Sequence, residues 1–293
     1  MILWAAAGLL ALAGVLGLCF WGAGVILHPP AMSPMWIFPE QFGLPYEKVS
    51  FKTRDGLLLK GWLLPSPTGD KRTIIMCHGW GDNKGELLKQ TYFLNEAAGF
   101  NLLYFDFRSH GESEGEITTI GGLETIDFDA AAAWLRTARP DLAERAGVFG
   151  VSMGAAVSVA AMPGHPDLKC VAVESPFSDY RGVVRRWGWN KFRVPHFPLI
   201  DLTLWMLRLR VGNPKIDDFN PVEAAPRISP RPLFVMGGEH DDLMPEEDVR
   251  RVFDAAREPK QLWIVPGGYH AKCREAAGME FDTRVAGFFN RNL

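Results

Sequence analysis

Six short apolar segments separated by stretches of helical patterning constrain the fold of this chain more than any other feature. The segments lie at 73–77, 101–107, 146–151, 170–173, 232–236 and 261–265. Apolar residues at helical spacing fill several of the gaps, notably at 85–98, 120–138 and 153–161. Strands that alternate with helices predict an α/β fold with a mostly parallel sheet and helices on both faces. Active residues then lie beyond the carboxyl ends of the strands.

Chain length and composition are those of a globular protein with one large domain. The chain has 293 residues, of which 47% are hydrophobic and 22% charged, and a formal net charge of −3. This near-neutral balance gives no reason to expect a nucleic-acid partner. Before the first predicted parallel strand, residues 47–66 alternate apolar and polar around Asp55 and Gly56, which predicts a two-stranded hairpin.

The first 30 residues form a separate, strongly apolar segment. No charged side chain occurs from residue 2 to 27, and 26 helical residues would reach roughly 39 Å, beyond the hydrocarbon core of a bilayer. We interpret residues 1–30 as an N-terminal transmembrane anchor, ended by the two prolines that follow His28. A cleaved signal peptide is the first alternative, although no Lys or Arg precedes the apolar run, and a buried core helix is the second. The first basic residue after it is Lys48, so the side of the membrane that holds the catalytic domain stays open.

The alternation of predicted strands and helices is interrupted between about 181 and 229. This stretch is too long for a simple connection and has helix-like apolar spacing of its own, so we interpret it as an inserted lid. The predicted organisation is an anchor at 1–30, a core formed by 31–180 and 230–293, and a lid at 181–229.

A serine flanked by glycines lies where one predicted strand meets a predicted helix. The run Gly150-Val151-Ser152-Met153-Gly154 ends an apolar strand and opens an Ala-rich stretch, as a nucleophile elbow requires. The serine of such an elbow sits in a strained turn, where a Cβ at either glycine would collide with neighbouring backbone. Its hydroxyl projects from the sheet, and the amide of the next residue can donate to an oxyanion.

Five motifs in a fixed order carry a resemblance to a known superfamily. They are His78-Gly79-Trp80-Gly81, residues 106–113, residues 150–154, residues 241–245, and Gly268-Tyr269-His270. With them, the chain from about 47 to 290 resembles the α/β-hydrolase superfamily. The ordering is most similar to the membrane-anchored, serine aminopeptidase-like hydrolases, which include many bacterial esterase-like proteins. The resemblance implies an α/β-hydrolase fold and a catalytic triad in the order Ser, acid, His.

Ser152 is the predicted nucleophile and His270 the predicted base. A serine hydroxyl needs a neutral histidine to take its proton, and that histidine needs a carboxylate to fix its tautomer. Three acidic residues follow the segment 232–236 and are candidates for this carboxylate: Glu239, Asp241 and Asp242. The family spacing Asp-x-apolar-apolar-Pro selects Asp241, and Asp242 would then face solvent or shape the loop. Glu174 is a lower-ranked alternative, because hydrolases of this superfamily sometimes keep an acid after the preceding strand.

The resemblance also assigns an oxyanion hole and several structural residues. Its two donors are the backbone N–H groups of Trp80, which follows the His-Gly pair, and Met153, which follows the nucleophile. We interpret His78 as a structural histidine, and Arg108 and His110 as scaffold. The four cysteines show no paired or zinc-binding spacing and are predicted to be buried free thiols. No nucleotide, dinucleotide or metalloprotease motif occurs, so we expect no cofactor.

The predicted lid is basic and aromatic. Eight basic residues and a single acid, Asp201, occur between Arg181 and Lys215, interleaved with Trp, Phe, Met and Leu. Such segments are characteristic of surfaces that lie on anionic bilayers, and the lid would then feed an acyl chain into the site. The alternative is that the aromatic residues pack on the core while the arginines face water.

These features together predict a membrane-anchored serine hydrolase that cleaves a carboxylic ester or thioester of a small-molecule or lipid acyl substrate. One alternative is an aminopeptidase-like peptidase. Another is an enzyme whose lid cations hold a soluble anionic substrate, such as an acyl group on a phosphorylated carrier. A third is a catalytically silent, membrane-tethered binding module, against which the presence of all three triad residue types in order argues.

Overall fold

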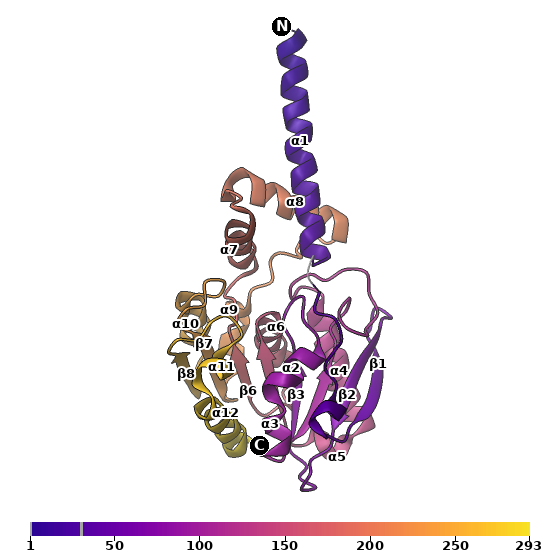
Figure 1. The fold of residues 1–293 in the computed structure, drawn as a ribbon, viewed down its shortest axis with the longest axis vertical. Coiled ribbons are helices and arrows are strands. Elements are labelled where there is room, and N and C mark those ends of the chain that lie inside the picture. Colours follow the sequence, from indigo (N-terminus) through magenta and orange to yellow (C-terminus); the bar gives the residue numbers. More distant parts are fainter. Residues whose placement is uncertain (1, 30–31) are drawn as a thin grey trace.

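The structure is a computed structural model that describes residues 2–29 and 32–293. Within these residues the centre is a sheet of eight strands in the order β1-β2-β4-β3-β5-β6-β7-β8 (Figure 1). Strand β2 pairs antiparallel with β1 and β4, and the pairs from β4 through β8 are parallel. The predicted hairpin and mostly parallel sheet are therefore confirmed. The strands are β1 Glu47–Lys52, β2 Leu58–Leu64, β3 Thr73–Cys77, β4 Asn101–Phe105, β5 Ala146–Val151, β6 Val171–Glu174, β7 Leu233–Gly238 and β8 Lys260–Val265.

The central strands are buried on both faces. Along β3, Ile74 and Met76 belong to one hydrophobic cluster, while Ile75 and Cys77 belong to the other. Helices α2, α3 and α12 cover the first cluster, and α4, α6 and α10 cover the second. This two-sided burial explains why these strands are apolar throughout rather than alternating.

The helices that surround the sheet follow the predicted pattern, with differences at their ends. Residues 85–98 divide into two helices, and the helix expected from 120 begins at Glu124. The Glu124 carboxylate accepts the N–H groups of Thr119 and Gly121, both at 2.7 Å, and so closes a loop ahead of the helix. These elements are η1 Pro39–Phe42, α2 Lys84–Thr91, α3 Phe93–Glu96, α4 Glu124–Ala138, α5 Pro140–Ala143, α6 Met153–Ala161, η2 Met162–Gly164, α10 Glu246–Ala255, α11 Cys273–Ala277 and α12 Met279–Asn292.

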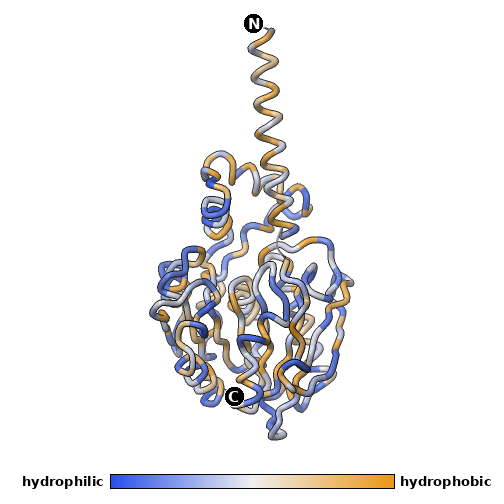
Figure 2. The backbone as a smooth tube through the Cα atoms, in the orientation of Figure 1, coloured by the Kyte–Doolittle hydropathy of each residue, from blue (hydrophilic) through white to orange (hydrophobic). Residues whose placement is uncertain are grey.

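Helix α1, Ile2–Leu27, projects from the rest of the molecule as a long apolar rod (Figures 1 and 2). Of the helices in the described residues, it is the one long and apolar enough to cross a membrane. A signal sequence has the same properties, so the anchor stays a prediction. The helix ends at Leu27 because Pro29, which has no N–H, follows His28. Residues Met1 and Pro30 of the predicted anchor lie outside the described residues.

Only the C-terminal half of α1 is packed against the rest of the chain. Residues Leu3 to Gly14 are exposed, whereas Cys19, Ala23 and Ile26 are buried at helical spacing. This face of α1 contacts α8 of the segment between β6 and β7. All four cysteines, including Cys19, are buried and unpaired, as predicted.

The chain between β6 and β7 forms a helical insert beside α1 (Figure 1). The first helix of the insert begins after Asp179, whose carboxylate accepts the N–H of Gly182 at 2.7 Å. The division of the chain at 180 and 230, and the role of a lid, stay predictions. The helical elements of the insert are α7 Tyr180–Phe192, η3 His196–Ile200, α8 Asp201–Val211, α9 Pro221–Ala224 and η4 Ala225–Arg227.

Candidate active site

Ser152 occupies a sharp turn between β5 and α6. Its backbone has φ 54° and ψ −115°, a strained conformation for a residue with a side chain. A Cβ at Gly150 would lie 2.5 Å from the carbonyl oxygen of Gly154, and a Cβ at Gly154 would overlap the carbonyl oxygen of Cys77. Only glycine therefore fits at these two positions, and the serine side chain is held at the carboxyl end of β5.

His270 and Asp241 reach Ser152 from the ends of two other strands. His270 Nε2 lies 3.0 Å from Ser152 Oγ, and His270 Nδ1 lies 2.8 Å from Asp241 Oδ2. Asp241 follows β7 and His270 follows β8, so the three residues meet because parallel strands end at the same edge of the sheet. The structure thus brings the three predicted side chains into one hydrogen-bonded chain.

The Asp241 carboxylate is held by the turn that follows it. Its Oδ1 accepts the N–H groups of Leu243 at 3.1 Å and Met244 at 2.7 Å, while Oδ2 faces His270. The side chain is fully buried, so these donors replace the water that an ionised carboxylate would otherwise need. The carboxylate is positioned to keep the proton of His270 on Nδ1 and to leave Nε2 as an acceptor.

The other acidic candidates occupy different positions. Asp242 and Glu239 are exposed, and Glu239 accepts the N–H of Gly267 at 2.8 Å, which ties the loop after β7 to the loop after β8. Glu174 is buried at the end of β6 and accepts the N–H of Cys273 at 2.9 Å. Burial raises the pKa of the Glu174 carboxyl. Within the described part of the chain, Asp241 is the carboxylate that bonds His270.

The two predicted oxyanion donors flank Ser152. Met153 is the first residue of α6, and Trp80 lies in the turn after β3, next to Gly79, where a Cβ would be 3.4 Å from Ser152 Cβ. Within residues 2–29 and 32–293, no acceptor is found for the backbone N–H of Trp80 or Met153. Both residues line the cavity that contains Ser152 and His270. Their amides are therefore placed where they could bind an anionic oxygen.

Two buried histidines hold the loop that carries Trp80. His78 Nε2 accepts the N–H of Phe107 at 3.0 Å, and His110 Nε2 accepts the N–H of Gly81 at 3.0 Å. Burial lowers the pKa of both imidazoles, so both stay neutral, with the proton on Nδ1. These bonds fit the structural role predicted for His78 and His110.

Arg108, two residues before His110, is buried and bonds two acids. It bonds Asp127 at 2.7 Å and Asp55 at 2.9 Å. The pKa of Arg108 is raised despite its burial, because hydrogen bonds to the Asp127 carboxylate stabilise the cation. This arrangement fits the scaffold interpretation of Arg108.

The cavity at Ser152 is mostly apolar and has a volume of about 260 Å³, close to the lower end of the roughly 300–1,000 Å³ usual for small-molecule sites. Sequence reasoning missed the residues that shape it, above all Ile26 of α1 and Trp187 of α7. Ile26 lies within an apolar run, and Trp187 is one of several aromatic residues between basic ones, so neither position carries a signal of such a role. The apolar lining residues are Ile26, Trp80, Ile120, Met153, Phe177, Val183, Val184, Trp187, Leu243 and Met244.

The basic residues of the insert are in part paired within the chain. Arg181 and Arg208 bond Asp217, at 3.2 and 2.6 Å, and Arg185 bonds Asp201 at 3.3 Å. Arg186 pairs with an acid of α10. Several large apolar side chains of the insert nevertheless face outwards, among them Trp189, Phe197, Trp205 and Leu209. The surface of the insert is thus less cationic than its sequence suggests and remains aromatic.

The chain has the α/β-hydrolase fold, and its sequence is similar in part to the S15 peptidases and to esterase-like proteins of that superfamily. Residues 63–204 match the X-Pro dipeptidyl-peptidase (S15) family. The chain is 27% identical over 218 residues to YqkD of Bacillus subtilis, covering 74% of this chain and 70% of that protein. It is 27% identical over 230 residues to YfhR of Escherichia coli K12, covering 76% and 73%.

A solved structure extends the similarity to nearly the whole chain. The esterase Pf2001 of Pyrococcus furiosus superposes with a TM-score of 0.75 at 27% sequence identity. The match covers 91% of this chain and 98% of that esterase. The α/β-hydrolase fold implied by the sequence motifs is therefore confirmed.

Proposed function

We propose that this protein hydrolyses a carboxylic ester or thioester with an apolar acyl group, using Ser152, His270 and Asp241 as a catalytic triad. One observation carries the proposal: the hydrogen-bonded chain from Asp241 through His270 ends at Ser152 Oγ inside an apolar cavity. An activated serine in such a cavity suits a substrate that has a reactive carbonyl and a hydrophobic acyl chain.

The reaction would proceed through an acyl-enzyme. As Ser152 Oγ attacks the carbonyl carbon, His270 Nε2 takes the hydroxyl proton, and the N–H groups of Trp80 and Met153 stabilise the oxyanion. The intermediate collapses, the bond to the leaving alcohol or thiol breaks, and His270 returns its proton to that group. A water molecule then attacks the acyl-enzyme while His270 takes one of its protons. Collapse of the second intermediate releases the acid and restores Ser152.

The cavity favours an ester or thioester over a peptide with a free amino terminus. An aminopeptidase or an X-Pro dipeptidyl-peptidase must bind the charged ammonium of its substrate, and a buried charge requires a partner. Within the described residues, no Asp or Glu lines the cavity. An ammonium group placed there would be unpaired. The same described lining contains no Lys or Arg, so a phosphorylated carrier would have to bind outside it.

The test of this proposal compares esters with amides. Full-length protein in detergent should hydrolyse p-nitrophenyl esters and leave aminoacyl p-nitroanilides intact, and Ser152→Ala should abolish the ester activity. Hydrolysis of the anilides in preference to the esters would favour the peptidase. Binding of an acyl compound without turnover would favour a silent binding module.

We also propose that α1 anchors the protein and that the insert touches the membrane through its aromatic side chains. Trp205 of α8 is 48% exposed on a helix that packs along α1, so it would lie near the bilayer surface, where Trp is enriched. In reconstituted vesicles, the fluorescence of Trp205 is the difference between the wild type and Trp205→Phe. Brominated lipids should quench this difference. An unquenched difference would place the exposed face of α8 in water.

A further inference from the structure

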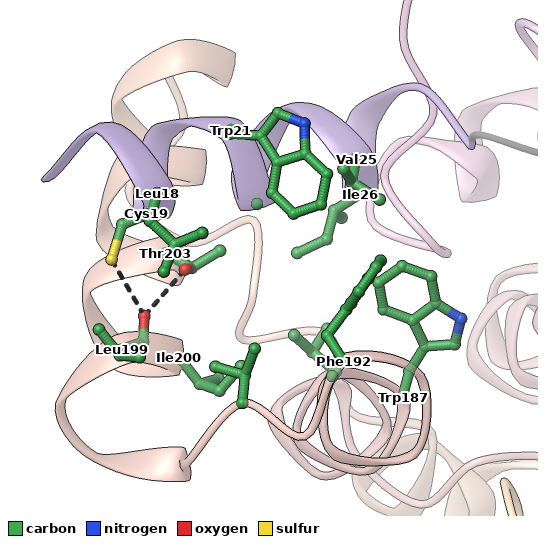
Figure 3. A pocket seen from close by; sticks show the side chains of 14 residues that line it. Leu18, Cys19, Trp21, Val25, Ile26, Trp187, Phe192, Leu199, Ile200 and Thr203 are labelled. Atoms are coloured by element: carbon green, nitrogen blue, oxygen red, sulfur yellow. Dashed lines mark hydrogen bonds between the residues drawn. The ribbon is translucent and has the colours of Figure 1, made fainter. Parts of the chain in front are cut away.

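The C-terminal half of α1 borders a second apolar cavity, which adjoins the candidate active site. This outer cavity lies between α1 and the insert and has a volume of about 50 Å³, and no charged side chain lines it within the described residues. Side chains of α1 and α7 face each other across it (Figure 3). Its walls include Leu18, Trp21 and Val25 of α1, and Phe192, Leu199 and Ile200 of the insert.

Three residues border both the outer cavity and the catalytic cavity that contains Ser152. They are Ile26 of α1 and Val184 and Trp187 of α7. Ile26 and Val184 are each 3% exposed, so they form an interior wall rather than a surface. The two cavities therefore lie on either side of three shared residues, and apolar side chains line both, from Leu18 in the outer cavity to the surroundings of the proposed nucleophile.

A row of edge-to-face aromatic pairs follows the same route. Ring centroids lie 5.5 Å apart between Trp21 and Phe192, 5.3 Å between Phe192 and Trp187, and 5.4 Å between Trp187 and Trp80. Aromatic side chains in this geometry attract each other beyond their buried area, so the row is a stable wall. It connects the apolar N-terminal helix to the loop that presents a proposed oxyanion donor.

The rim of the outer cavity lies near one end of the exposed length of α1. Trp4 and Trp21 are 84% and 52% exposed and are separated by 21 − 4 = 17 residues, or about 26 Å of helix at 1.5 Å per residue. This length is close to the hydrocarbon thickness of a bilayer, about 30 Å, and Trp is enriched at both interfaces. With α1 in a membrane, Leu18 and Trp21 at the rim would lie where hydrocarbon meets headgroups.

We infer that α1 is part of the substrate-binding site and not only an anchor. The far end of one long acyl chain lies in the outer cavity against Leu18 to Ile26, while its carbonyl carbon lies at Ser152. This inference rests on the proposed function and narrows its substrate to long-chain acyl esters or thioesters that enter from the bilayer. It also requires that α1 be retained, because its removal would open the outer cavity to water.

A photoreactive probe of the nucleophile tests the path directly. The probe is an alkyl fluorophosphonate with a diazirine at the far end of a long chain, used on full-length protein in membranes. Ser152 Oγ bonds to phosphorus, fluoride leaves, and His270 takes the serine proton. Photolysis should then cross-link the chain end to α1 at 18–26 or to the insert at 188–203. A matched probe with the diazirine near phosphorus should cross-link only to residues of the catalytic cavity.

The outcomes separate this inference from the proposed function. If the probe labels Ser152 but the long chain cross-links only to the core, for example to Ile120 or Phe177, the proposed role of α1 is wrong. The proposed hydrolase function is unaffected by that result. Failure of the probe to label Ser152 overturns both.

Chain-length selectivity gives a second test that does not use the probe. Leu18→Trp fills the rim at a position that is 47% exposed, and Leu12→Trp makes the same change on an exposed part of α1 outside the cavity. One buried methylene contributes about fourfold to binding, so displacing two should lower the ratio of kcat/KM for dodecanoate over butyrate esters about 15-fold in Leu18→Trp. The ratio should stay constant in Leu12→Trp. An unchanged ratio in both variants overturns the inference.

Discussion

Replacement of Asp241 by Asn removes a charge behind the proposed base while keeping the shape of the side chain. Asp241 Oδ1 accepts the N–H groups of Leu243 and Met244, and Oδ2 faces His270 Nδ1 at 2.8 Å. An asparagine side chain has one carbonyl oxygen, and that oxygen stays with the two backbone donors, because an NH2 group there would oppose both. The NH2 group of the introduced amide is therefore directed at His270.

This reversal places the proton of His270 on the wrong nitrogen. With an N–H donor facing it, Nδ1 must accept, so the proton moves to Nε2, the atom that has to take the proton of Ser152. The same tautomer change in serine proteases lowers kcat about 10⁴-fold, which corresponds to about 5 kcal/mol of transition-state stabilisation. We expect a loss of that order with little change in KM, because Asp241 does not line the catalytic cavity.

The assay measures kcat and KM for a p-nitrophenyl ester in Asp241→Asn and in Asp242→Asn. Asp242 is the next residue and is exposed, so its variant makes the same chemical change away from His270 and should keep near wild-type kcat. Circular dichroism checks that both variants are folded. A near wild-type kcat in Asp241→Asn, or a larger loss in Asp242→Asn, would refute the assignment of the acid.

Three further predictions follow from other parts of the fold. Gly154→Ala places a Cβ against the Cys77 carbonyl and should lower the free energy of unfolding by about 1–3 kcal/mol in denaturant titrations, whereas Gly164→Ala meets open space and should not. Burial raises the pKa of Glu174 above its ordinary 4.5, so the folded protein keeps a proton that the unfolded chain releases, and stability falls as pH rises above about 4.5. Glu174→Gln should remove this pH dependence of stability, so its Tm should exceed that of the wild type at about pH 8 and not at about pH 4. The variant should also retain ester hydrolysis. Loss of hydrolysis would assign the acid role to Glu174. Mass spectrometry of the membrane-derived protein should find α1 retained, while a mass lacking the apolar segment would identify a cleaved signal peptide.

The sheet could be predicted because parallel strands buried on both faces occur in the sequence as short apolar runs. Residues 73–77 and 146–151 are strands over the predicted lengths, since their apolar runs match their burial on both faces. The segment 101–107 ends as a strand at Phe105 because Phe107 donates its N–H to the His78 side chain instead of to a neighbouring strand. A bond to a distant side chain has no local signal.

The candidate site could likewise be predicted only in part. Ser152, Asp241 and His270 could be located because each follows a recognisable strand within a short motif, and parallel strands bring their ends together. The walls of the site could not be located, because Ile26 belongs to a helix that is apolar on every side and no pattern marks its packed face. Pairing of the lid arginines was equally hidden, since Asp217 and Asp248 lie outside the stretch that contains those arginines.

The proposal that Ser152 is a catalytic nucleophile is tested most directly by intact-mass spectrometry of the full-length protein after treatment with a fluorophosphonate. We predict one adduct per chain, located on Ser152, no adduct in Ser152→Ala, and much slower labelling in His270→Ala, because the serine then lacks its base. An adduct that persists in Ser152→Ala, or a folded wild type that never reacts, would contradict the proposal.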